Sequence, residues 1–326
     1  MAINGIETLL YGVEDLAKCT KYFEDFGLPV QRRSTTESVF ELEEGSKVIL
    51  RSIGDPSIPT SKIEGIGVRE VTWGVDTQAN LDRLASDLKC DRPVHRDLDG
   101  TAHFLADDGI AYALRVFRKN NVVAAPDPIN APGKVNRLNQ HRKWRTRARP
   151  KTIQHVVFSS IDPQQSFEFM RDRLGFKLTD ISRGLGYFAR CDGANDHHNI
   201  FWINANWPAP GLDGKVRFNH ANFGVEDIDE IMIGANFMER AGWAKSNNGL
   251  GRHRIASALF FYLPCPAGGE AEYGADSDVL DDSWVPRIWD PAFGIAHFMH
   301  NLPPFLQQAP AWDVKFAEGY TPAARV

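Results

Sequence analysis

Residues 247–273 place three chemically active side chains within one short stretch: the imidazole of His253, the phenol of Tyr262 and the carboxylate of Glu272. An apolar run over 257–263, followed by a Pro-Ala-Gly-Gly turn, predicts a strand and a return strand. Glu272 would then lie on the return strand beside the strand that carries Tyr262. Carboxylate and imidazole are ligands of divalent metals, so this stretch predicts one part of a metal site.

An internal repeat points to the other ligands. Residues 6–30 and 153–178 share one plan, in which an apolar β-branched run is followed by an acidic helix start, an amphipathic helix and a further strand. Residues 68–88 and 218–243 form a second matching pair. The sequence therefore predicts an α+β fold of four βαβββ modules, paired into two homologous domains with mixed sheets curled around a cavity.

The two halves differ at three matched positions, and only the second half carries metal-binding residue types there. The pairs, first half against second, are Thr8 with His155, Glu70 with His220, and Ala113 with Glu272. Two neutral imidazoles and one carboxylate occupy one face of an ion and leave about three positions open, as in non-haem Fe(II) enzymes that activate oxygen. A single histidine on a strand is more often a structural residue of the core or surface, and Glu270 is an alternative carboxylate ligand.

The alternation of side chains along a strand assigns faces to the two histidines. A period of two puts His155 on the opposite face from Val156, and it puts Phe218, His220 and Asn222 on one side. A histidine among apolar neighbours needs a polar partner, and a bound metal would supply it.

Composition limits the class of protein. The chain has 326 residues, 43% hydrophobic and 24% charged, with a net charge of −5, which argues against a nucleic-acid partner and favours a small molecule. The four cysteines show no metal-site or redox spacing, and no apolar run reaches the length of a membrane span. With no leader-like segment at the N-terminus, we expect a cytoplasmic protein without a membrane association.

The organisation along the chain follows from the repeat. We expect a non-catalytic N-terminal domain over 1–120 and a catalytic, metal-binding domain over 152–290. The Pro-rich and basic segment 121–151 between them is interpreted as a solvated linker or an interface helix. The tail 291–326, rich in proline and aromatic residues, is expected to pack on the second domain or on another subunit.

Beyond these residue-level arguments, the sequence resembles a known family. Its motifs are His155, His220, the HHNIFW segment 197–202, GRHRIASALFFY at 251–262 and PAGGEAEYG at 266–274. Together they are similar to the type I extradiol ring-cleavage dioxygenases of the vicinal-oxygen-chelate superfamily, which also contains the glyoxalases and bleomycin-resistance proteins. The resemblance covers nearly the whole chain and is specific in residues 153–289.

The resemblance implies a ligand set and a reaction. It implies that Fe(II), with Mn(II) as an alternative, is bound by His155, His220 and Glu272, and that His198, His253 and Tyr262 are catalytic. His198 would be the acid or base beside oxygen. Apart from the resemblance, one alternative is that the adjacent His197 is the exposed member of the pair. The implied reaction opens the ring of a catecholic compound, substituted or trihydroxylated, with O2 to a semialdehyde or acid. A homo-oligomer is expected as well.

Some alternatives stay open. Members that act on biphenyl-type substrates carry Asn-Asp after the histidine that corresponds to His253, whereas this chain has Arg254, Ile255 and Ala256. Arg252 or Arg254 would then meet an anionic ring substituent or form a surface ion pair. A metal-dependent glyoxalase or isomerase and a metal-free binding protein of the same superfamily are the rival functions.

Overall fold

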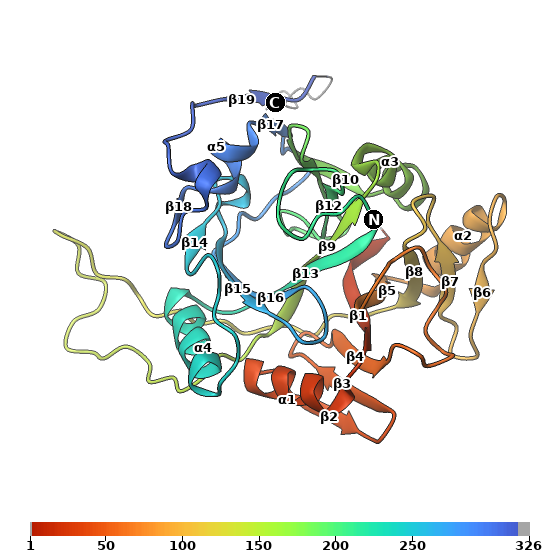
Figure 1. The fold of residues 1–326 in the computed structure, drawn as a ribbon, viewed down its shortest axis with the longest axis horizontal. Helices are drawn as coiled ribbons and strands as arrows, with labels where there is room; N and C mark the ends of the chain where they lie inside the picture. Colours follow the sequence, from red (N-terminus) through yellow and green to blue (C-terminus); the bar gives the residue numbers. More distant parts are fainter. Residues whose placement is uncertain (1, 319–326) are drawn as a thin grey trace.

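The computed structural model describes residues 2–318 and contains two mixed sheets that lie side by side (Figure 1). The first sheet has the strand order β2-β3-β4-β1-β5-β8-β7-β6. Its strands are β1 Ile3–Val13, β2 Val30–Arg33, β3 Glu37–Glu41, β4 Lys47–Ser52, β5 Gly67–Val75, β6 His95–Arg96, β7 Ala102–Leu105 and β8 Ala111–Val116. Its helices are α1 Leu16–Phe26 and α2 Gln78–Lys89.

The second sheet repeats this order and extends it at both ends, as β18-β14-β15-β16-β13-β9-β12-β11-β10-β17-β19. The repeated strands are β9 Thr152–Ser160, β10 Lys177–Ser182, β11 Gly186–Arg190, β12 Ile200–Asn204, β13 Arg217–Gly224, β14 Gly251–Arg252, β15 Leu259–Pro264 and β16 Glu270–Ala275. The helices are α3 Pro163–Leu174 and α4 Ile228–Arg240, with a short 3-10 turn at Ile255–Ser257.

Each quarter of the chain is one βαβββ module whose first and last strands pair in parallel. The four parallel pairs are β1 with β4, β5 with β8, β9 with β12, and β13 with β16. The predicted fold class is confirmed. The boundaries at residues 120 and 152 remain a prediction, because one hydrophobic core runs through both sheets.

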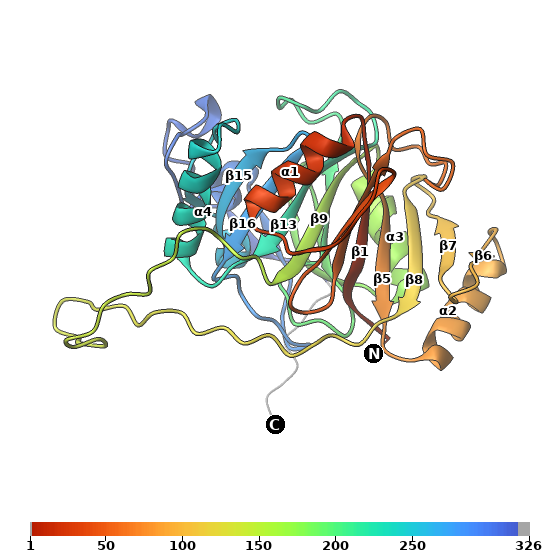
Figure 2. The same ribbon diagram turned by 90° about the horizontal axis from the view of Figure 1, so that it is seen from below.

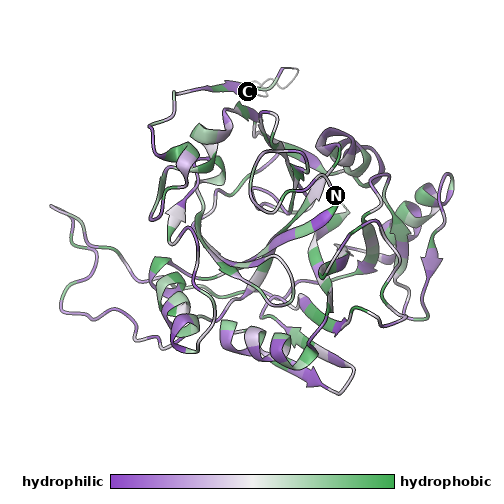
Figure 3. Ribbon diagram, in the orientation of Figure 1, coloured by the Kyte–Doolittle hydropathy of each residue, from purple (hydrophilic) through white to green (hydrophobic). Residues whose placement is uncertain are grey.

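Local sequence signals explain the four module helices. Each begins after an aspartate or threonine whose side chain accepts a hydrogen bond from a backbone N–H of the first turn, a common N-cap. These caps are Asp15, Thr77, Asp162 and Asp227. Gly27 and Gly175 end α1 and α3 in the left-handed region, where glycine is favoured. Hydrophobic and hydrophilic residues share each helix (Figure 3), and the apolar faces pack on the sheets.

The two sheets have equivalent strand register at the positions that matter for chemistry. In the first sheet Thr72 lies opposite Thr8 on one side and Ala113 on the other. In the second sheet Asn222 lies opposite His155 and Glu272. The matching of Thr8 with His155 and of Ala113 with Glu272, made from the sequence, is therefore structurally correct.

The expected faces of β13 are wrong at one residue. Phe218 lies opposite Phe158, whereas His220 lies opposite Val157, so Asn219 is an extra residue in a β-bulge. Phe218 therefore packs in the main core, and His220 and Asn222 share the other face. A period of two fails wherever such a residue is inserted.

Aromatic residues join the two halves. The ring of Phe26 at the end of α1 stacks on Tyr273 of β16 with centroids 4.0 Å apart. The Tyr273 hydroxyl donates to the carbonyl of Phe26 at 2.7 Å. Helices α1 and α4 lie next to each other across the same boundary (Figure 2).

The segment between the sheets projects from the body as a long extended arm (Figures 1 and 2). All of residues 118–151 are described and none is helical, so the interface-helix alternative is wrong. Ion pairs such as Arg145 with Glu226 fix the C-terminal part of the arm to the second sheet. Leu138 and Trp144 of the arm are exposed, by 74% and 89%.

The described part of the tail adds to the second sheet. It follows β17 Arg287–Trp289 and contains α5 Pro291–Ile295, β18 Phe298–Met299, a 3-10 turn at Pro304–Leu306 and β19 Val314–Phe316. Strand β18 pairs with β14, and β19 pairs with β17. The last eight residues of the expected tail, 319–326, lie outside the described part. Within residues 2–318 no helix has the length and apolar character needed to cross a membrane.

Candidate metal centre and its surroundings

A row of directly opposed side chains crosses four strands of the second sheet. His155 of β9 lies opposite Asn222 of β13, which lies opposite Glu272 of β16, which in turn lies opposite Tyr262 of β15. Opposed residues of neighbouring strands have adjacent Cβ atoms, so the register alone brings these side chains together. The expected strand over 257–263 begins two residues late, because Ala256 and Ser257 have φ angles of 64° and 51° and turn the chain.

His155, His220 and Glu272 converge on one point. The Nε2 atoms of the two imidazoles are 3.3 Å apart, and they lie 3.2 Å and 3.4 Å from Oε2 of Glu272. All three side chains are buried, and they form the one cluster of potential metal ligands found in residues 2–318. The structure thus assembles the three residues that the repeat singled out.

Both imidazoles of the cluster are neutral, and the tautomer of His220 is fixed. Burial lowers the pKa of His155 and of His220 to about 3, so both rings are neutral near pH 7 and their contacts with Glu272 are not ion pairs. Asn219 lies 2.7 Å from Nδ1 of His220 through its Oδ1, which fixes the ring proton on Nδ1. Nε2 of His220 then carries a lone pair.

Oε2 of Glu272 has no hydrogen-bond partner within the described residues, although the side chain is 1% exposed. A buried acceptor without a donor is costly, and the lone pair on Nε2 of His220 beside it adds to the cost. A divalent cation would be a partner for all three ligand atoms at once. The donor set therefore fits a metal with nitrogen and oxygen preference.

Glu270, the alternative carboxylate, is not part of this cluster. Glu270 lies opposite His220 in the register of β13 and β16. Burial and the charge of Glu272 raise the pKa of Glu270 to about 7.

His198 lies directly beside the cluster. Its ring stacks on His155 with centroids 4.1 Å apart and meets the edge of Phe188 at 5.0 Å. Burial and the neighbouring histidines hold the pKa of His198 well below its ordinary value, so the ring is neutral.

His253 and Tyr262 form a hydrogen-bonded pair on the other side. Nδ1 of His253 donates to the carbonyl of Ile295, so its Nε2 is an acceptor, 3.2 Å from the Tyr262 hydroxyl. The Tyr262 ring also lies 5.0 Å from the ring of His220. All six side chains selected from the sequence therefore form one connected group.

Arg252 and Arg254 are both occupied by partners within the chain. Arg252 donates to Asp276 at 2.8 Å and to the carbonyl of Ser257. Arg254 donates to the carbonyls of Phe293 and Ala296, which close the short helix α5. Both guanidinium groups therefore stabilise contacts within the chain.

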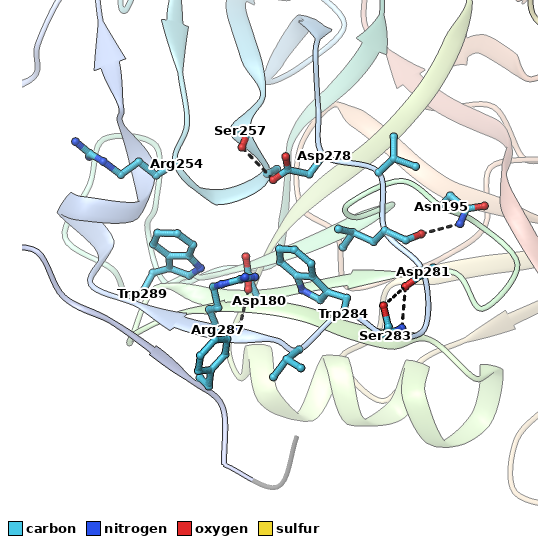
Figure 4. Close-up of a pocket in the computed structure, with 15 residues that line it drawn as sticks. Asp180, Asn195, Arg254, Ser257, Asp278, Asp281, Ser283, Trp284, Arg287 and Trp289 are labelled. Atoms are coloured by element: carbon cyan, nitrogen blue, oxygen red, sulfur yellow. Dashed lines mark hydrogen bonds between the residues drawn. The ribbon is translucent and has the colours of Figure 1, made fainter. Parts of the chain in front are cut away.

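Sequence reasoning placed His197 wrongly. It is 1% exposed, not the exposed member of the pair, and its Nε2 lies 3.1 Å from Asp180. Asp180 lies in the wall of a cavity of about 940 Å³, beside Trp284 and Arg287 (Figure 4). The histidine doublet was a visible signal, whereas nothing local in the sequence connects it to Asp180.

Comparisons with known proteins agree with this geometry. Residues 152–264 match the family model described as "Glyoxalase/Bleomycin resistance protein/Dioxygenase superfamily". This segment is a domain of that superfamily. The resemblance inferred from the sequence is thereby confirmed.

Two relatives and one solved structure illustrate the similarity. "Metapyrocatechase 2" of Cupriavidus necator is 26% identical over 288 residues, which cover 86% of this chain and 83% of the relative. The "Iron-dependent extradiol dioxygenase" of Rhodococcus jostii (strain RHA1) is 32% identical over 146 residues, 41% of this chain and 46% of the relative. The crystal structure of a Mn(II)-bound glyoxalase from Novosphingobium aromaticivorans superposes with a TM-score of 0.70 at 20% identity, covering 95% of this chain and 96% of that chain. This last likeness shows the shared fold.

Proposed function

We propose that the protein is an Fe(II)-dependent extradiol dioxygenase that opens the ring of a catecholic compound with O2. The observation that carries the proposal is the convergence of two neutral imidazoles and one buried, unpartnered carboxylate oxygen at His155, His220 and Glu272. The names of the two relatives, a metapyrocatechase and an extradiol dioxygenase, support the same reaction class.

The three ligands would hold the ion by one face. When bound, the metal supplies Lewis-acid and redox chemistry to a substrate and to oxygen at its remaining positions. The chain contributes the fixed orientation of each ligand. Asn219 sets the tautomer of His220, as partners of metal-bound histidines usually do.

His253 and Tyr262 are suited to handle the proton of a substrate hydroxyl. Nε2 of His253 is a lone-pair acceptor that now receives the hydrogen bond of the Tyr262 hydroxyl. A catechol hydroxyl within reach would lose its proton to Nε2 of His253, and the tyrosine hydroxyl would then donate to the oxygen left behind. Burial, with the charge of Glu272, raises the pKa of Tyr262 well above its usual value, which keeps it a donor.

His198 would act from the opposite side, stacked on His155. Because the ring is neutral, one of its nitrogens is a base and the other a donor. It can therefore accept or deliver a proton beside the metal without adding a permanent charge to the site.

An apolar wall next to His198 suits an aromatic substrate and excludes water. Phe188 and Phe201 stack at 3.8 Å and belong to a buried cluster with Val157 and Ile255. A substrate ring that packs against these apolar side chains would be desolvated, which strengthens its polar contacts with the site.

We propose Fe(II) rather than Mn(II) as the bound ion. Iron appears in the name of the Rhodococcus relative, and Mn(II) is bound in the glyoxalase of similar fold. Nitrogen and carboxylate ligands accept both ions.

Anaerobic loading with Fe(II), followed by a panel of catechols, hydroquinones and trihydroxybenzenes in air, tests the function. We expect oxygen uptake and a yellow ring-opened product with at least one catechol. Metal-dependent isomerisation of a hemithioacetal or keto substrate without oxygen would instead indicate a glyoxalase or isomerase. Purified protein that binds no divalent metal would indicate a metal-free binding protein.

We also propose a homo-oligomer and a cytoplasmic location. The arm over 118–151 is supporting evidence for the oligomer, because Leu138 and Trp144 are exposed on a segment that projects from the body. Light scattering of the intact chain and of a Leu138→Ser/Trp144→Ser variant would test it. A monomeric mass for the intact chain would contradict the oligomer. The four cysteines form no disulfide, which supports a reducing compartment.

A further inference from the structure

Three buried side chains form a hydrogen-bonded line that begins at His198 and leads away from the candidate metal ligands. Nδ1 of His198 lies 3.0 Å from Nδ1 of His197, and Nε2 of His197 lies 3.1 Å from Oδ2 of Asp180. Asp180 is 0% exposed and His197 is 1% exposed.

The direction of the hydrogen bonds is fixed at the Asp180 end of this line. The backbone N–H of Arg287 in β17 donates to Oδ1 of Asp180 at 2.7 Å. A carboxylate accepts and does not donate, so Nε2 of His197 must carry the proton that faces Oδ2. In a neutral imidazole the other nitrogen is then an acceptor. Nδ1 of His197 therefore receives the proton of His198 Nδ1.

We propose that Asp180 and His197 are positioning residues that hold His198 in the tautomer with its proton on Nδ1 and a free lone pair on Nε2. The inference rests on the proposed role of His198 as the acid or base of the reaction. In that role His198 begins as a base, because its remaining nitrogen has no proton to block it. The carboxylate thus acts on the reacting atoms only through two imidazole rings.

The surroundings keep the line rigid. Trp284 meets the ring of His197 edge-on at 5.9 Å, and its indole N–H donates to the carbonyl of Thr179 at 2.7 Å. Phe188 meets His197 at 6.2 Å from another side. A buried hydrogen-bonded network that is enclosed in this way has one low-energy arrangement of its protons.

The orientation of the Asp180 carboxylate depends on strand β17. Asp180 pairs with Arg287 in the parallel register of β10 and β17, and a bulge before Asp180 separates it from Leu178. Strand β17 follows the catalytic repeat, so the segment that completes this network lies more than a hundred residues beyond Asp180 in the sequence. Figure 4 shows Asp180 between Arg287 and Trp284 at the cavity wall.

Asp180→Asn reverses the donor and acceptor roles along this line with little change in the shape of the side chain. The Arg287 N–H still requires an acceptor, so the amide oxygen takes the place of Oδ1 and the amide nitrogen faces His197. The amide then donates to Nε2 of His197, and Nδ1 of His197 donates to Nδ1 of His198. His198 is left with its proton on Nε2.

Histidine ¹⁵N correlation spectra of the metal-free protein read these tautomers directly. We expect the His198 proton on Nδ1 in the wild type and on Nε2 in Asp180→Asn. Asp281→Asn is the matched control, since Asp281 lines the same cavity and its carboxylate accepts hydrogen bonds from Ser283 and is not part of the line. It should leave the His198 signals unchanged.

In the metal-loaded enzyme, Asp180→Asn should lower kcat by about 10²- to 10⁴-fold, the contribution of a correctly protonated general acid or base. The catechol KM and the bound metal should stay within about threefold of the wild type, because only transition-state chemistry is affected.

A wild-type spectrum with the His198 proton on Nε2 would overturn the inference without any variant. An unchanged tautomer in Asp180→Asn, or a kcat equal to that of Asp281→Asn, would overturn it as well. Absence of ring cleavage in the wild type would instead count against the proposed function, while the spectra would still decide the direction of the line.

Discussion

Replacing Glu272 by Gln should remove most of the stabilisation that a metal gives to the folded chain, whereas Glu270→Gln should not. Glu272 supplies the only formal charge within the cluster of three ligands, and its Oε2 has no other partner. Glu270 lies two residues away on the same strand and is absent from that cluster. The two substitutions are therefore chemically identical but structurally different.

The expected size follows from mass action. A metal present at 100 times its dissociation constant stabilises the folded state by about 2.7 kcal/mol. If losing the carboxylate weakens binding about 100-fold, the same metal concentration stabilises the Glu272→Gln variant by only about 0.4 kcal/mol. At about 2.1 cal/mol/K of unfolding entropy per residue, the difference of about 2.3 kcal/mol corresponds to a change in Tm of roughly 3–4 °C for a chain of 326 residues.

Thermal unfolding with and without Fe(II) or Mn(II), under anaerobic conditions, measures this difference. The wild type and Glu270→Gln should show the full metal-induced rise in Tm, and Glu272→Gln should show almost none. A full rise in Glu272→Gln would refute the ligand assignment. Loss of the rise in Glu270→Gln alone would move the carboxylate ligand to that residue.

Three further predictions concern other parts of the molecule. Tyr262→Phe should keep the metal but lower kcat/KM for catechols by about 10²- to 10⁴-fold, as loss of a proton-handling group does, measured by oxygen uptake beside metal analysis; unchanged turnover would remove Tyr262 from the chemistry. The hydrogen bond with Glu70 raises the pKa of His103 despite burial, so the pair stabilises the fold most below about pH 6.5, and this contribution is lost as pH rises through the higher folded pKa. Glu70→Gln should therefore lower the urea midpoint at pH 5.5 more than at pH 8.5, and an equal loss at both values would contradict this reasoning. Phe26→Ala should cost about 3–5 kcal/mol in urea unfolding, because it empties a fully buried site stacked on Tyr273, whereas a cost below about 1 kcal/mol would show that the two halves are not coupled there.

Much of the site was predictable because the repeat carries register information. Once the two halves are aligned, the position of one strand residue fixes its neighbours in the sheet, and Thr8 with His155 is enough to relate Ala113 to Glu272. The module order followed for the same reason. Hydrophobic periodicity and capping residues defined each strand and helix locally, and the repeat showed how often the unit recurs.

The errors have non-local or irregular causes. A bulge at Asn219 breaks the strand period, and only the paired strand reveals it. The alternative of an exposed His197 fails because strand β17 pairs with the edge of β10, and His197 is buried with Asp180. Neither the inserted residue nor the returning strand leaves a periodic signal near the residue that it affects.

The first half of the chain shows why equivalent register does not by itself create a second metal site. At its matched positions Thr8 donates to Glu7 at 2.6 Å, and Glu70 lies 2.9 Å from Nδ1 of His103. Ala113 is fully buried, with no side-chain oxygen to offer. Among the described residues the carboxylates on this face, Glu7 and Glu70, have partners, so neither resembles Glu272 with its unpartnered Oε2. The difference between the halves therefore lies in unsatisfied hydrogen-bonding capacity and not in backbone architecture.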